Sequence, residues 1–68
     1  MKLTEKAIEL LTETGALRLN IALLMDCSES TVRRWINENE PNGDLTKFEV
    51  IQLIRKETGL QIKELYKN

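Results

Sequence analysis

The chain has 68 residues, of which 41% are hydrophobic and 31% charged, and its formal net charge is −1. These values predict one small globular domain over residues 1–68, since domains typically span about 100–150 residues and disordered chains contain fewer apolar side chains. The sequence has no histidine and only one cysteine, Cys27. This composition excludes histidine-dependent catalysis, a cysteine-rich zinc site and an internal disulfide.

Sequence signals for an enzyme, a cofactor or a membrane are missing. No apolar run approaches about 18 residues, the length of a membrane span, and the first five residues have mixed charge instead of an apolar signal segment. The chain has neither a glycine-rich phosphate loop nor a cluster of metal ligands. We therefore expect a cytoplasmic protein that is not an enzyme, holds no metal or other cofactor, and binds neither a membrane nor a small molecule.

Apolar residues recur at helical spacing, without the sustained alternation that is typical of strands. We expect an all-α fold of five helices at about 5–14, 17–25, 29–38, 47–58 and 61–66. Gly15 and Gly59 are expected to end the first and fourth helices, because glycine readily adopts left-handed geometry. The segment between the third and fourth helices is polar and contains Pro41 and Gly43, which is typical of a loop.

Helix starts also have sequence signals. Thr4 and Ser28 are expected N-caps of the first and third helices. Thr46 and Glu49 have the spacing of a capping box, which predicts that the fourth helix starts at Thr46. The expected buried stripe of the second helix consists of Leu17, Ile21, Leu24 and Met25.

The second and third expected helices resemble a helix-turn-helix, in which two helices cross closely and are joined by about three to four residues. Ala22 supplies a small side chain at the crossing, Asp26 stands where glycine is usual in the turn, and Cys27 would lie inward. Val32 and Trp35 match the two buried positions of the second helix of that motif. Aspartate adopts left-handed geometry more readily than most residues, so Asp26 is compatible with the turn.

With five compatible helices around this motif, residues 17–66 resemble the phage-repressor and Cro-like family. The resemblance implies a compact, lambda-repressor-like domain with the helix-turn-helix as its second and third helices. It implies sequence-specific binding of double-stranded DNA by a transcriptional regulator, a repressor, with the helix at 29–38 in the major groove. It also implies a homodimer on DNA, for which exposed parts of Leu60, Ile62 or Tyr66 would provide a pairing surface.

The same resemblance assigns candidate DNA contacts. The expected contacts to base edges are Ser28, Glu29, Ser30, Arg33 and Arg34. The expected contacts to phosphates are Arg18, Asn20, Asn37, Asn39 and Lys47.

Structural roles compete with these assignments. Ser28 serves first as an N-cap, and Glu29 is also explained as a first-turn acid that the helix dipole favours. The pair Arg33 and Arg34, taken alone, would be a solvated helix face. Trp35 and Cys27 are interpreted as core residues.

Two other functions remain open at this stage. The net charge of −1 and the acidic loop with Glu38, Glu40 and Asp44 fit a helical protein-interaction module that keeps the fold with weak or no DNA binding. The DNA-binding half of an antitoxin, which would add a protein partner, is the third interpretation. Because the sequence starts at Met1 and shows no effector domain after residue 66, we expect a complete protein controlled by its own concentration or by a partner.

Overall fold

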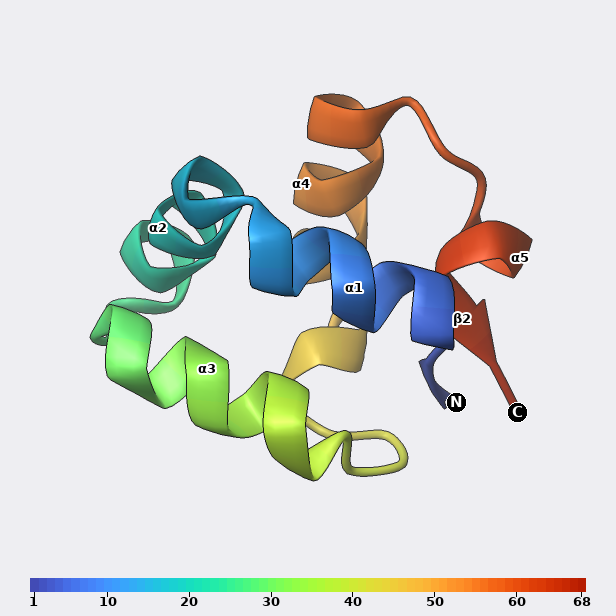
Figure 1. The fold of residues 1–68 in the computed structure, drawn as a ribbon, viewed down its shortest axis with the longest axis horizontal. Helices are drawn as coiled ribbons and strands as arrows, with labels where there is room; N and C mark the ends of the chain where they lie inside the picture. Colours follow the sequence, from blue (N-terminus) through green and yellow to red (C-terminus); the bar gives the residue numbers. More distant parts are fainter.

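The structure, a computed structural model, describes residues 1–68. Its elements are β1 (Lys2–Leu3), α1 (Glu5–Glu13), α2 (Gly15–Met25), α3 (Glu29–Glu38), the 3₁₀-helix η1 (Asp44–Thr46), α4 (Phe48–Thr58), α5 (Ile62–Leu65) and β2 (Tyr66–Lys67) (Figure 1). Five α-helices and a single two-stranded sheet confirm the predicted all-α class. None of these helices is both long enough and apolar enough to cross a lipid bilayer.

The helices enclose one core. In Figure 1, α1 crosses the centre of the molecule, α2 and α3 lie on one side of it, and the two chain ends lie close together on the other. α2 packs against α1, α3 and α4, so it connects the first three helices to the fourth. The buried apolar side chains are Leu3, Ala7, Leu11, Leu17, Ile21, Ala22, Val32, Ile36, Leu45, Val50, Ile51, Ile54, Leu65 and Tyr66.

Several predicted helix ends are confirmed. The hydroxyl of Thr4 accepts a hydrogen bond from the Ala7 N–H at 3.2 Å, and that of Ser28 accepts one from the Thr31 N–H at 3.2 Å, so both residues are N-caps. Gly59 ends α4 with φ 72°, in the left-handed region where glycine carries no steric cost.

The prediction that Gly15 ends the first helix is wrong. α1 ends at Glu13, with Thr14 (φ −110°, ψ 87°) as its C-cap, and Gly15 is the first residue of α2. The N–H groups of Leu17 and Arg18 both donate to the Thr14 carbonyl at 3.2 Å, so the first turn of α2 closes directly on the residue that ends α1. The chain changes direction at Thr14, and no left-handed residue is needed there.

The predicted capping box at Thr46 and Glu49 is also wrong. Thr46 lies in η1, where its hydroxyl donates to the Gly43 carbonyl at 2.7 Å, and the N-cap of α4 is Lys47. A capping-box bond occurs instead at α5, where the Gln61 N–H donates to a carboxylate oxygen of Glu64 at 2.9 Å. That bond is the main cause of the lowered pKa of Glu64.

A small antiparallel sheet joins the two ends of the chain and was not predicted. β1 pairs with β2 so that Lys2 lies opposite Lys67 and Leu3 opposite Tyr66. Strands of two residues are too short to show alternation in the sequence. The last helix is consequently shorter than expected, because Tyr66 belongs to the sheet.

Tyr66 connects this sheet to η1. Its side chain is buried, and its hydroxyl donates to the Leu45 carbonyl at 2.6 Å. Burial raises the pKa of Tyr66, because the charged phenolate is poorly solvated in the core.

We expect Tyr66→Phe to lower the free energy of unfolding by about 1–2 kcal/mol, since the Leu45 carbonyl would lose its buried donor. Because the folded pKa lies above the unfolded value of about 10, native Tyr66 stabilises the fold below that pH, and this contribution disappears as the pH rises further. Urea denaturation at neutral and alkaline pH measures both effects. A variant that loses stability above pH 10 as steeply as the native chain would contradict the assignment.

The two helix-end glycines make a matched pair. A Cβ on Gly15 would make an ordinary contact, 3.5 Å from the Arg18 guanidinium, whereas Gly59 has φ 72°. We therefore expect Gly15→Ala to stabilise the fold by about 0.4–1 kcal/mol, and Gly59→Ala to destabilise it by about 1 kcal/mol. Thermal unfolding of both variants tests this, and destabilisation by Gly15→Ala would indicate that Gly15 has a role beyond helical geometry.

Candidate nucleic-acid interface

A short turn joins α2 to α3. α2 ends at Met25 and α3 begins at Glu29, so three residues connect two helices that pack against each other. Asp26 has φ 53° and ψ 51°, the left-handed geometry predicted for this position. The Cys27 N–H donates back to the Ala22 carbonyl at 2.9 Å, which closes the end of α2, and Cys27 is half-buried against the core. Ala22 itself is buried.

One side of α3 is free of other elements. Val32 and Ile36 are buried, whereas five side chains on the remaining surface are exposed: Ser30, Arg33, Arg34, Asn37 and Glu38. At about 100° per residue these five occupy one continuous side of the helix. The three predicted base-contacting residues Ser30, Arg33 and Arg34 therefore lie together on an accessible surface.

The other two predicted base contacts have partners within the protein. The Ser28 hydroxyl is occupied as the N-cap and lies 3.0 Å from the Thr31 hydroxyl. The Glu29 carboxylate lies 3.2 Å from the Arg18 Nε and 3.6 Å from an Arg33 guanidinium nitrogen. Glu29 thus stands between two arginines, one buried and one exposed.

Arg18 has a structural position instead of the predicted phosphate contact. The residue is only 8% exposed. Its Nη1 donates to the carbonyls of Leu11 (2.8 Å) and Thr12 near the C-terminal end of α1, and its Nε donates to Glu29. Because the negative end of the α1 dipole and a carboxylate already surround the guanidinium, it is not available to a phosphate. Arg18 therefore contributes to the packing of α1, α2 and α3, in place of the phosphate contact expected from the sequence.

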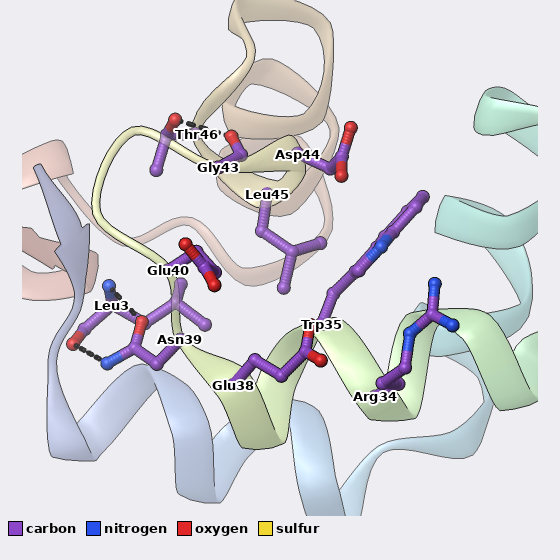
Figure 2. A pocket seen from close by; sticks show the side chains of 10 residues that line it. All are labelled: Leu3, Arg34, Trp35, Glu38, Asn39, Glu40, Gly43, Asp44, Leu45 and Thr46. Atoms are coloured by element: carbon purple, nitrogen blue, oxygen red, sulfur yellow. Dashed lines mark hydrogen bonds between the residues drawn. The ribbon is translucent and has the colours of Figure 1, made fainter.

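Asn39 is likewise used inside the protein. It ends α3 in left-handed geometry, and its side-chain amide forms two hydrogen bonds with the backbone of Leu3 (Figure 2). The amide oxygen accepts from the Leu3 N–H at 2.8 Å, and the amide nitrogen donates to the Leu3 carbonyl at 3.2 Å. The side chain thereby attaches β1 to the end of α3. Asn39 has this structural role in place of the phosphate contact expected from the sequence.

The remaining predicted phosphate contacts differ in availability. The Asn20 amide donates to the Glu57 carboxylate at 2.8 Å and so links α2 to α4. Lys47 is half-exposed and lies 3.5 Å from the Asp44 carboxylate. Asn37 is exposed at the end of the free side of α3. Asn37 and Lys47 are therefore the two that keep an accessible polar group.

A groove lies between the C-terminal half of α3 and η1 (Figure 2). It has a volume of about 370 Å³, and the half-buried Trp35 lines one part of it. Three carboxylates also line the groove, those of Glu38, Glu40 and Asp44, against a single arginine, Arg34. This charge would repel a DNA backbone, so no phosphate is expected inside the groove itself.

The predicted pairing surface on the last helix is largely absent. Tyr66 is buried and Leu60 is half-buried, which leaves only Ile62, at 39% exposure, as an apolar contact. More exposed apolar side chains lie elsewhere: Phe48 at the start of α4 is 70% exposed, and α2 exposes three leucines, among them Leu24, which was expected in the core and is 46% exposed. The spacing of Leu19 and Leu23 outside the expected buried stripe was the sequence signal for this surface.

Comparison of the chain with protein-family models, with curated proteins and with solved structures found no match. The resemblance to phage repressors consequently remains a prediction from the residues of the second and third helices. What the structure adds is the accessible side of α3 and the left-handed turn that precedes it.

We expect Arg18→Met to lower the free energy of unfolding by about 2–3 kcal/mol, because buried carbonyls of α1 and the Glu29 carboxylate would lose a charged donor. Arg34→Met is the matched control, since Arg34 is exposed and forms no ion pair, and it should change stability by less than about 0.5 kcal/mol. Chemical denaturation compares the two. Equal, small effects would contradict the structural role of Arg18.

Proposed function

We propose that this protein binds double-stranded DNA sequence-specifically, with α3 in the major groove, and represses transcription by occupying its site. The observation that carries the proposal is the free side of α3, where Ser30, Arg33 and Arg34 are all exposed directly after a three-residue turn. A helix that follows such a turn and projects from the protein has the dimensions to enter a major groove.

Arg33 is the principal base reader in this proposal. An arginine can donate two hydrogen bonds to guanine O6 and N7, which is the commonest specific protein–DNA contact. The Glu29 carboxylate lies 3.6 Å from the Arg33 guanidinium and restricts its orientation. Glu29 therefore acts as a partner of Arg33, while Ser30 and Arg34 are the additional contacts on the same side of the helix.

Backbone contacts are few. Lys47 and Asn37 are the candidates, and the acidic groove next to them limits their number. Because non-specific affinity depends on how many phosphates are neutralised, this protein should bind random DNA weakly. Weak single-site binding favours two copies on a two-fold symmetric site, with half-sites about 34 Å apart or a multiple of that distance.

A protein-interaction module is the second candidate function. It is favoured by the net charge of −1, by the three carboxylates beside the groove at Trp35, and by the exposed leucines of α2. An antitoxin-like protein would combine such a surface with DNA binding. Selection from a pool of random DNA duplexes at low and at moderate salt separates the candidates, because only a DNA reader enriches a defined sequence.

On a selected site, we expect Arg33→Ala to cost about 1–3 kcal/mol of binding free energy and to relax the preference at one base pair. Lys47→Ala should weaken binding to all DNA sequences alike. It should also reduce the slope of the logarithm of the binding constant against the logarithm of the salt concentration by about one. Fluorescence anisotropy with the selected duplex and its single-base variants measures both quantities.

Lys56→Ala is the control, since it removes the same charge from an exposed position on α4. It should leave the base preference intact. If Arg33→Ala also preserves the preference and Arg34→Ala removes it, Arg34 is the base reader. If no duplex is enriched at either salt concentration, the protein does not read DNA and the interaction module is the better interpretation.

A further inference from the structure

The outer side of α2 is apolar and has no partner. Leu23 is 80% exposed and Leu19 is 52% exposed, and Ala16 is exposed one turn before Leu19. Residues separated by three and four positions share one side of a helix, so these three side chains form a continuous strip, which we call the α2 strip. Contiguous exposed apolar surface on a small protein is a frequent mark of an interaction site.

The α2 strip contains no charge. The only charged residue of α2 is Arg18, and it is buried on the opposite side of the helix among the carbonyls of α1. The other long helices, α1, α3 and α4, all expose charged side chains. A partner that covers the α2 strip therefore needs no complementary charge, and it must itself be apolar and uncharged.

We propose that the α2 strip binds the same strip of a second copy of this chain, with the two α2 helices antiparallel across a two-fold axis. A second copy is the partner that supplies an uncharged apolar helix face of matching length. A two-fold interface is self-complementary, so one surface serves both copies. This inference names a pairing surface and does not rest on DNA binding.

Side-chain size sets the register of the two helices. An antiparallel arrangement with the two-fold axis between the levels of Leu19 and Asn20 brings Leu23 level with Ala16 of the second copy at each end and leaves the two Leu19 side chains within one residue of each other near the axis. Large residues then face small ones, which allows the helices to interdigitate closely. A parallel pair would instead put leucine against leucine and alanine against alanine.

The area of the strip indicates a weak dimer. Stable dimers bury about 800 Å² per partner, and one side of a three-turn helix supplies less than that. The whole chain exposes 4315 Å², so a stable interface would cover almost a fifth of its surface. We expect a dissociation constant on the order of 100 μM, and one that salt does not weaken, because the contact is apolar.

Sedimentation equilibrium of the full chain over a range of concentrations tests the surface. Leu23→Lys should raise the dissociation constant by about tenfold or more, because it places an ammonium group in an apolar contact. Ile62→Lys is the control, since it puts the same charge on an exposed apolar position of α5, outside the α2 strip. Both positions are exposed, and unchanged thermal unfolding would show that both variants fold.

A native chain that stays monomeric at the highest concentration would overturn the proposal. A dimer that Ile62→Lys disrupts and Leu23→Lys does not would overturn it as well. If self-association weakens steeply with salt, charged groups hold the dimer together and the apolar strip does not.

A charge-pair variant tests the antiparallel register. In the double variant Ala16→Glu with Leu23→Lys, each introduced carboxylate would face the introduced ammonium of the other copy, twice per dimer. The double variant should therefore recover about three- to tenfold of the affinity that Leu23→Lys loses. Positions 16 and 23 lie about 10 Å apart along one helix, too far to pair within a copy. A double variant that associates no better than Leu23→Lys alone would overturn the register.

Discussion

Arg18 holds three helices together, and the arrangement of the candidate interface depends on it. The guanidinium belongs to α2, donates to carbonyls at the end of α1, and pairs with the carboxylate of Glu29 in the first turn of α3. Its positive charge is buried at only 8% exposure, where an unpaired charge would be costly. The helix-end carbonyls and the carboxylate supply the compensation, so these contacts favour the observed relative position of the three helices.

This arrangement also determines which charged groups on the surface of α3 are available to a ligand. Glu29 is neutralised from the inside by Arg18, and its second oxygen is within 3.6 Å of the exposed Arg33. A carboxylate that would repel a phosphate backbone is therefore turned into a support for an arginine. In the proposed complex, the buried arginine sets the orientation of the exposed one through the acid between them.

Local features were predictable from the sequence, and long-range features were not. The caps Thr4 and Ser28, the left-handed Asp26 and the end of α4 at Gly59 each depend on a few neighbouring residues, and all were found where expected. Thr46 satisfied the same local rule and failed, because a preceding 3₁₀ turn uses its hydroxyl.

The candidate site shows the same division. The exposure of Arg33 and Arg34 follows from helical periodicity, which makes them predictable. Arg18 and Asn39 were expected to contact phosphate, but their partners lie on α1 and β1, and Asn39 bonds to Leu3 across 36 positions of sequence. No spacing rule within α2 or α3 contains that information, because these partners are defined only once the helices pack.

The exposed faces of α2 and α3 differ in polarity and charge. α3 exposes two arginines, an asparagine, a serine and, at its end, Glu38, a surface that is polar and carries a net positive charge, whereas α2 exposes leucine and alanine and no charge. The one cation of α2 is directed inward, where it stabilises the fold. Burying Arg18 thus leaves the outside of α2 free of charge, and an uncharged apolar helix face cannot serve as a phosphate contact but can pair with its own copy. Arg18 thus supports α3, the helix proposed to bind DNA, and its burial also leaves α2 with an uncharged face suited to protein contact.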